Sequence, residues 1–495
     1  MDKSKGNMKK SLLSGLFWVL LANLLVKPFW ILGIEVEVQN AVGAEMYGFY
    51  YSILSLSFIL NILLDFGITN FNTRNIAQNP NLISKHLSGL LTIKLLLFAL
   101  YLVVSFSVGA LLGYNSRQFR LLAWICLNQF LNSLILYLRS NFEGLLLFKW
   151  DSLLSVMDRL LMIVICALLL WCPMGQGLFR IEWFVGAQTV AYAATALLAL
   201  AVLIRKTGFR HLHWNHPFTI VILKKSLPFA LLVLLMASYN RIDPVMLQKL
   251  SAAGYGDHNA GIYAGAFRLL DALTMIAYLV SVLLLPIYSK LTKHLEEAKN
   301  HTDLTSITQM MFSMMMVFAV TTSCALSAFS TPLMELFYDT CNDEYSTVFS
   351  ILIFCIIPIS TTYVFGTLLT AAGCLKKLNI YAFCSLVLNI IINIFCIPRW
   401  GALGSAFAAL GAQTFMAAAQ VIAAVKQFKM NVSGLYILRL LIFALSISGC
   451  ALLTPQLDWR IAVSLIAVLS IGLSMALRLI DLKEIIKIIK TETTT

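Results

Sequence analysis

The sequence predicts an all-α polytopic membrane protein with about 14 transmembrane helices. Composition is the first reason, because 60% of the 495 residues are apolar and only 12% are charged. A soluble globular domain has roughly 45–50% apolar and 25% charged residues. The second reason is that long apolar runs recur along the whole chain, so no stretch has the composition of a separate soluble domain.

Each predicted span is an apolar run of roughly 20 residues or more, the length needed to cross the hydrocarbon core. The first run follows the basic segment MDKSKGNMKK. It is too long for a signal-peptide core and has no small-residue cleavage site, so we expect a retained span. The spans are predicted near residues 11–37, 44–70, 83–112, 118–142, 151–171, 181–204, 219–248, 260–289, 306–330, 346–372, 378–397, 401–425, 434–454 and 459–480.

The basic residues orient these spans. With both termini cytoplasmic, about 23 of the 36 lysines and arginines lie on the cytoplasmic side and about six on the other, as the positive-inside rule requires. The net charge of +13 is therefore explained first by the basic residues that orient the spans in the membrane. A nucleic-acid partner is not expected, because such binding needs a soluble basic surface.

Two classes of chemistry are disfavoured by the motifs. The segment Asp65-Phe66-Gly67 matches a kinase tripeptide, but the chain has no His-Arg-Asp catalytic loop. The ten cysteines stand singly, mostly within apolar runs, without metal-ligand spacing. We therefore predict no disulfide framework, no metal site and no cofactor.

An internal repeat relates the two halves of the chain. EMYGFYYSILSL resembles HNAGIYAGAFRL, with Gly48, Tyr50 and Leu56 matching Gly261, Tyr263 and Leu269 at one constant spacing. Because six spans return the chain to its starting side, the halves would be parallel repeats, an architecture of alternating-access transporters. The sequence thus predicts two six-helix lobes, 1–210 (spans 1–6) and 211–430 (spans 7–12), and an additional segment, 431–495, with spans 13 and 14 and a cytoplasmic tail.

Ionisable residues lie inside many of these spans, where each costs about 2.5–3.5 kcal/mol unless it faces a cavity or a partner. Lys27 and Lys94 have no acid at helical spacing, so we expect them to line a cavity and meet an anion, with snorkelling to an interface as the alternative. Arg139 with Glu143, and Arg268 with Asp271, have the spacing of same-helix pairs, and both the paired and the cavity interpretation stay open.

Asp65 and Arg74 would lie on opposite sides of a continuous helix, so they pair only if the helix breaks near Gly67. We expect Asp65 either to face the cavity or to cap an inner gate. Arg241 and Asp243 are two residues apart, so at least one of them needs another partner or water.

The segment NIIINIFCIPRWGALGSAFAALGAQ joins predicted spans 11 and 12. Asn389 and Asn393 share one helix face, and Pro398 with Gly401 forms the turn into a face of small residues that includes Gly404. Small residues let helices approach closely, and asparagine can bond between helices. Helix packing is favoured here over contact with a ligand.

This last segment resembles the Asn-x3-Asn…Pro-x2-Gly-x2-Gly-Ala-Ala signature of the polysaccharide repeat-unit (O-antigen and capsule) flippases, with Ser405 in place of one alanine. GAEMYGFYYSIL and DFGITNFNTRNIA are similar to two further segments of that family. The resemblance implies membership of the multidrug, oligosaccharidyl-lipid and polysaccharide exporter superfamily, and two lobes around a central cavity with two additional C-terminal helices.

The resemblance also implies a substrate, an undecaprenyl-pyrophosphate-linked oligosaccharide moved from the cytoplasmic to the periplasmic leaflet of the bacterial inner membrane for O-antigen, lipopolysaccharide or capsule synthesis. A diphosphate at membrane depth needs cationic donors. From depth and charge, the candidates are Lys27, Lys94, Arg159, Arg241 and Arg268. Acids that could carry H⁺ or Na⁺, or act at a gate, are Asp65, Asp158, Asp243 and Asp271. A polysaccharide polymerase and a chain-length regulator would be partners beside the membrane lipids.

Two alternatives stay open. A cation-coupled multidrug exporter of the same superfamily would be expected to have twelve spans and a cavity richer in acids and aromatic residues. A membrane glycan polymerase or transferase would be an enzyme, and the short predicted loops disfavour that class. We therefore expect a transporter.

Overall fold

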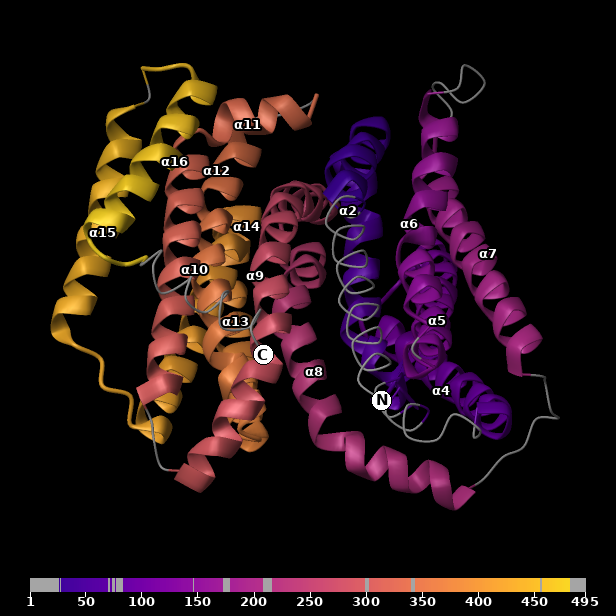
Figure 1. Cartoon of the computed structure of the whole chain (residues 1–495). Coiled ribbons are helices and arrows are strands. Elements are labelled where there is room, and N and C mark those ends of the chain that lie inside the picture. Colours follow the sequence, from indigo (N-terminus) through magenta and orange to yellow (C-terminus); the bar gives the residue numbers. More distant parts are fainter. Residues whose placement is uncertain are drawn as a thin grey trace. The chain divides into compact units, whose positions relative to one another are not determined.

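The structure is a computed structural model of the whole chain (Figure 1). It describes residues 26, 28–69, 72–73, 76, 83–145, 147–171, 179–207, 216–298, 302–339, 343–454 and 456–480. The predicted cavity residue Lys27 and the basic residue Arg74 lie outside the described residues. Within the described residues every regular element is a helix, so the predicted all-α fold is confirmed.

The chain divides into two compact units. Unit 1 is Met1–Ala264 and unit 2 is Gly265–Thr495, and the boundary lies within helix α9. The helices of unit 1 are α2 (Glu35–Leu60), which continues into a 3₁₀ turn at Asn61–Leu64, then α4 (Ile83–Leu111), α5 (Ser116–Gly144), α6 (Phe148–Trp171), α7 (Ile181–Thr207), α8 (His216–Leu250) and the start of α9 (Gly256–Ala298).

Unit 2 contains the rest of α9 and the helices that follow it. These are α10 (Thr302–Ala328), α11 (Ser330–Phe337), α12 (Asp343–Leu352), α13 (Ile356–Ala371), α14 (Leu375–Phe428), α15 (Gly434–Leu453) and α16 (Trp459–Ala476). Helices α15 and α16 pack on α10 (Figure 1). Phe443, Ile447 and Ile466 are buried in that contact. The predicted spans 13 and 14 are therefore present, and α10 supports both.

The predicted spans can now be matched to helices. Twelve described segments are long and apolar enough to cross a membrane. One of them, α14, contains two predicted spans, because Gly401 has φ 53° and ψ −128° and breaks the helix there. The remaining difference from the predicted fourteen is the span at 11–37, most of which lies outside the described residues. The chain is thus a multi-pass membrane protein, and the three-part division at 210 and 430 stays a prediction.

The break at Gly401 folds the two halves of α14 onto each other. Gly404 approaches so closely that a Cβ on it would lie 2.5 Å from the carbonyl oxygen of Cys396. The Ser385 hydroxyl donates a hydrogen bond of 2.7 Å to the carbonyl of Ala412. Asn393 Nδ2 donates to Asn389 Oδ1 at 2.8 Å, and both side chains are fully buried. Small residues and buried amides therefore lie where the two halves of α14 meet, and their role in helix packing stays a prediction.

The two glycines of the internal repeat lie against each other. A Cβ on Gly48 of α2 would collide with the carbonyl of Asp257, and a Cβ on Gly261 of α9 would collide with the carbonyl of Ala44. Ala44 and Asp257 also occupy matching positions of the two segments, so the contact is symmetric with respect to the repeat. Gln39 adds a buried hydrogen bond of 3.0 Å from its Nε2 to the carbonyl of Gly261. Only glycine allows this approach of two backbones.

This contact yields a stability prediction. Gly48→Ala should force α2 and α9 apart and cost about 1–3 kcal/mol or more, because the added methyl group meets backbone that cannot rotate away. The measurement is thermal unfolding of the purified protein in detergent. Gly449→Ala in α15 is the matched control, because a Cβ there has open space and should leave the melting temperature unchanged or slightly raised. Equal melting temperatures for both variants would contradict the close approach.

Candidate functional site

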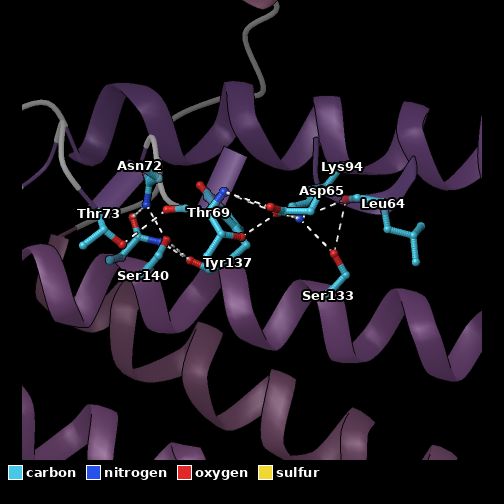
Figure 2. Close-up of polar contacts among 10 residues, drawn as sticks. Leu64, Asp65, Thr69, Asn72, Thr73, Lys94, Ser133, Tyr137 and Ser140 are labelled. Atoms are coloured by element: carbon cyan, nitrogen blue, oxygen red, sulfur yellow. Dashed lines mark hydrogen bonds and ion pairs between the residues drawn. The ribbon is translucent and has the colours of Figure 1, made fainter. Parts of the chain in front are cut away.

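The charged side chains inside the spans are the candidate site, and Lys94 shows the most completely determined surroundings. Its side chain on α4 is only 1% exposed. Nζ donates to Asp65 Oδ1 at 2.6 Å, to Ser133 Oγ at 2.9 Å and to the carbonyl of Leu64 at 3.0 Å (Figure 2). An ammonium group has three hydrogens. All three are therefore used within unit 1.

The end of α2 creates the acceptors for this lysine. After the 3₁₀ turn, Phe66 and Gly67 have φ 43° and 80°, so the helix breaks where the sequence allows it to break. The break leaves the carbonyl of Leu64 to accept from Lys94 and from the Ser133 hydroxyl. Asp65 also accepts from the hydroxyl of Thr69 at 2.5 Å and from its N–H at 3.3 Å. Asp65 is thus the centre of a local polar network.

The polar segment that follows is fixed on α5. Asn72 Nδ2 donates to Ser140 Oγ at 2.8 Å (Figure 2) and to Asn141 Oδ1 at 3.0 Å. The Thr73 hydroxyl donates to Glu143 Oε2 at 3.2 Å. Asp65 thus lies at the end of a span, and its two predicted roles, facing the cavity or capping an inner gate, both stay predictions. The role of Lys94 as a ligand for an anion stays a prediction, since binding would have to displace Asp65.

Arg139 does not use the partner that its helical spacing suggests. The expected i, i+4 pair with Glu143 is replaced by an ion pair between Arg139 Nε and Asp151 Oδ1, 2.7 Å apart. The physical reason is the short turn between α5 and α6, which brings the first turn of α6 beside the last turns of α5. Glu143 accepts from Thr73 instead. The sequence left the paired and the cavity interpretations of Arg139 open, and the ion pair with Asp151 is a contact that helical spacing alone does not predict.

Arg159 of α6 lies in an aromatic environment. Its Nη1 donates to the hydroxyl of Tyr192 on α7 at 2.9 Å, and its guanidinium lies 5.9 Å from the centre of the Trp30 ring. The carboxylate of Asp158 is 3.9 Å from Arg159 Nε. Trp30 Nε1 in turn donates to Glu35 Oε1 at 2.9 Å. A cation, aromatic rings and two acids therefore gather at membrane depth within unit 1.

Arg241 and Asp243 of α8 have separate partners, as their spacing requires. Arg241 Nη1 donates to the hydroxyl of Tyr51 on α2 at 2.9 Å, and its guanidinium lies 5.4 Å from the centre of the Phe58 ring. Asp243 is 1% exposed and accepts from the hydroxyl of Tyr263 at 3.0 Å.

Arg268 of α9 is the most deeply buried of the candidate arginines, with 4% exposure. Its Nη1 donates to the Tyr338 hydroxyl at 2.9 Å, and that hydroxyl donates to the carbonyl of Gly265 at 3.1 Å. Asp271 lies three residues further along α9 and is half-buried. The same kind of bond, from Nη1 to a tyrosine hydroxyl, thus occurs at Arg159, Arg241 and Arg268.

Sequence reasoning missed the tyrosines that these arginines contact. Tyr51, Tyr192 and Tyr338 are distant in sequence from their partners, and only their position inside or beside apolar runs could have drawn attention to them. Metal binding has no support in the described part of the chain, where His, Cys, Asp and Glu form no group of three or more.

The comparison with known proteins settles the family. Residues 12–292, more than half of the chain, match the family described as polysaccharide biosynthesis protein. The chain belongs to the polysaccharide biosynthesis protein family. This finding agrees with the resemblance seen in the sequence motifs. No curated protein sequence matches this family member significantly.

Solved structures establish the fold of this family member. A lipid II flippase MurJ in an inward closed conformation matches with a TM-score of 0.69 and 17% identity, over 93% of this chain and 98% of the other. An inward-facing MATE family multidrug transporter of the MOP superfamily has a TM-score of 0.61 and 14% identity, over 83% and 94%. The Vibrio cholerae MATE transporter VcmN has a TM-score of 0.52 and 16% identity, over 88% and 100%. The chain therefore has the polytopic fold of MOP-superfamily transporters.

The Lys94–Asp65 pair gives a second stability prediction. Asp65→Asn should cost about 3–5 kcal/mol, because it leaves the buried ammonium of Lys94 without a counter-charge. Lys94→Met should cost less, because the Asp65 side chain is 28% exposed and keeps its bonds from Thr69. The measurement is thermal unfolding in detergent.

The double variant Asp65→Asn with Lys94→Met is the control for this pair. It should recover much of the stability lost in Asp65→Asn, because it removes both charges. If Asp65→Asn were the least costly of the three changes, the buried pair would not be the stabilising feature.

Proposed function

We propose that this protein moves undecaprenyl-pyrophosphate-linked oligosaccharide repeat units from the cytoplasmic to the periplasmic leaflet of the bacterial inner membrane, with both termini cytoplasmic. The glycan would serve O-antigen, lipopolysaccharide or capsule synthesis. The family and the MurJ-like fold support a transporter of lipid-linked substrates. A polymerase and a chain-length regulator would receive the product.

The observation that carries the proposal is the presence of arginines at membrane depth that are held in place by tyrosines. A lipid diphosphate must lose much of its hydration as its headgroup crosses the membrane, so it needs strong donors along the way. Arginine suits this task because its planar guanidinium presents paired N–H groups to phosphate oxygens and stays charged. We assign this role to Arg159, Arg241 and Arg268.

Alternating access is the proposed mechanism. The parallel repeats, 1–210 and 211–430, would act as two lobes, with 431–495 as an appended pair of spans. A substrate that binds one conformation more tightly than the other shifts the population toward it. Asp158, Asp243 and Asp271 are the acids that could couple this shift to H⁺ or Na⁺. Asp65 has a structural role in this proposal.

The test of the function is transport by the purified protein in proteoliposomes. The wild-type protein should move an undecaprenyl-pyrophosphate oligosaccharide across the bilayer, and Arg268→Gln should reduce the rate by at least about tenfold, the effect of one lost charge-assisted contact. Arg439→Gln is the control, because this half-buried arginine lies on α15, outside the repeats.

A second outcome separates transport from enzymatic action. The glycan recovered after the assay should be chemically unchanged, whereas a polymerase or transferase would lengthen or transfer it. If the wild-type protein leaves the lipid-linked glycan on its original side, or if Arg268→Gln moves it as fast as the wild type, the proposal is wrong.

One observation favours a second candidate, a cation-coupled multidrug exporter. MATE transporters share the fold, and Asp243 is an acid buried at membrane depth. Efflux of cationic dyes from cells, driven by a Na⁺ or H⁺ gradient and abolished by Asp243→Asn, would support this candidate. We expect no such efflux, because arginines at membrane depth disfavour the binding of cations.

A further inference from the structure

Aromatic rings and hydroxyl groups meet between helices α9 and α13 of unit 2. The rings of Tyr278 on α9 and Tyr363 on α13 pack edge to face, with their centres 6.1 Å apart. One turn further along each helix, the hydroxyl oxygens of Ser281 and Thr367 are 2.8 Å apart. The Thr367 hydroxyl donates to the carbonyl of Tyr363 at 2.6 Å, so Ser281 is the donor to Thr367. We call these four side chains the hydroxyl seam.

The sequence of α9 gathers its polar side chains on the side of this seam. Between residues 271 and 285 the polar residues are Asp271, Thr274, Tyr278 and Ser281. At about 100° per residue these four positions fall within an arc of about 80°, and apolar side chains occupy the rest of the helix surface. A span surrounded by lipid alone gains nothing from a polar side. The pattern therefore indicates that this side of α9 meets water or polar groups.

The seam lies deep in the membrane. Its two helices run in the same direction, because the earlier residues of the seam contact each other and so do the later ones. The exposed lysines Lys290 and Lys376 follow the seam by 9–13 residues, which is about 14–20 Å at 1.5 Å per residue. Half of the hydrocarbon core is about 15 Å thick. The seam is therefore near the midplane, away from the interfacial belts where exposed tyrosines are common.

The seam is also accessible at this depth. Tyr278 is 50% exposed, and Ser281 and Tyr363 are half-buried. Among the described residues, the Tyr278 hydroxyl makes no hydrogen bond, and the Ser281 hydroxyl bonds only to Thr367. A hydroxyl that faces hydrocarbon without a hydrogen bond is costly. The space beside the seam is therefore suited to polar groups or water rather than to lipid tails.

Rings and hydroxyls side by side match the chemistry of a sugar. A pyranose has C–H groups on its faces, which pack on aromatic rings, and hydroxyls at its edge, which donate and accept hydrogen bonds. Tyr278 offers both a ring and a hydroxyl, and Ser281 offers lone pairs. Apolar walls with a few placed hydroxyls are typical of small-molecule sites. A diphosphate would instead need cationic donors, and a hydrocarbon tail would need no hydroxyls.

We infer that the hydroxyl seam binds a sugar of the lipid-linked oligosaccharide, with the ring of Tyr278 against a pyranose face. This inference rests on the proposed function and adds the groups that recognise the glycan, whereas the arginines are assigned to the diphosphate. The seam then contributes affinity only when the lipid carries a sugar, because a bare diphosphate has neither a C–H face nor ring hydroxyls.

Binding of two lipids tests this inference. Undecaprenyl pyrophosphate and undecaprenyl-pyrophosphoryl-N-acetylglucosamine differ by one sugar, and each would be titrated calorimetrically into the purified full-length protein in detergent. The wild type should bind the glycosylated lipid about tenfold more tightly. Tyr278→Leu should reduce this preference to less than about twofold, because it removes the ring and the hydroxyl together. Its affinity for undecaprenyl pyrophosphate should stay unchanged, which also shows that the variant is folded.

Two further variants make the test specific. Phe383→Leu is the matched control, because Phe383 of α14 is a 56% exposed aromatic residue of the same unit outside the seam. It should keep the tenfold preference for the glycosylated lipid. Ser281→Ala retains both rings and removes one hydroxyl, so it should lower the preference about threefold. This variant decides the question if Tyr278→Leu does not fold.

The outcomes separate the inference from the function on which it rests. Equal binding of both lipids by the wild type would overturn the sugar site while leaving transport, measured in proteoliposomes, intact. An unchanged preference in Tyr278→Leu and Ser281→Ala, or an equal loss in Phe383→Leu, would do the same. If the wild type binds neither lipid, the proposed function fails together with the inference. Loss of the preference in the seam variants alone supports the inference.

Discussion

The structure depends on one constraint, that a charged side chain at membrane depth must be matched by a suitable partner. An unmatched charge costs about 2.5–3.5 kcal/mol or more, comparable to a large part of the stability of a domain. Lys94 is buried almost completely, and the break at the end of α2 supplies the carboxylate and the carbonyl that it needs. The position of one lysine on α4 thus fixes how the preceding span ends.

The cations inside the spans contact two kinds of partner, carboxylates and tyrosine hydroxyls. Carboxylates pair with Lys94 and Arg139 and hold neighbouring helices together in unit 1. Tyrosine hydroxyls accept hydrogen bonds from Arg159, Arg241 and Arg268, and the Asp158 carboxylate also lies 3.9 Å from Arg159. The structural and the substrate-facing interpretations of these cations both stay predictions.

Glycines provide the second condition for this arrangement, because they let helices approach closely enough for side chains to meet. Gly48 and Gly261 allow backbone contact between matching segments of the repeat, and Gly401 folds α14 so that Gly404 lies against Cys396. At each place a side chain would separate the elements, so the contacts require the absence of a Cβ. The internal repeat, which is weak in the sequence, therefore appears in the structure as a symmetric contact of Gly48 and Gly261.

The sequence by itself determined the class of protein, most of the spans and the list of charges at membrane depth. Hydropathy and charge suffice for these, since apolar runs and buried charges are properties of local sequence. The sequence also indicated the family, through short motifs around Gly48, Asp65 and Asn389. Only the tertiary structure decided the partners. Arg159, Arg268 and Arg241 are 33, 70 and 190 residues away from their tyrosines, distances over which no helical or strand periodicity relates two side chains. The same reason explains why the ion pair of Arg139 with Asp151 is absent from the sequence pattern, because local spacing relates Arg139 only to residues of its own helix.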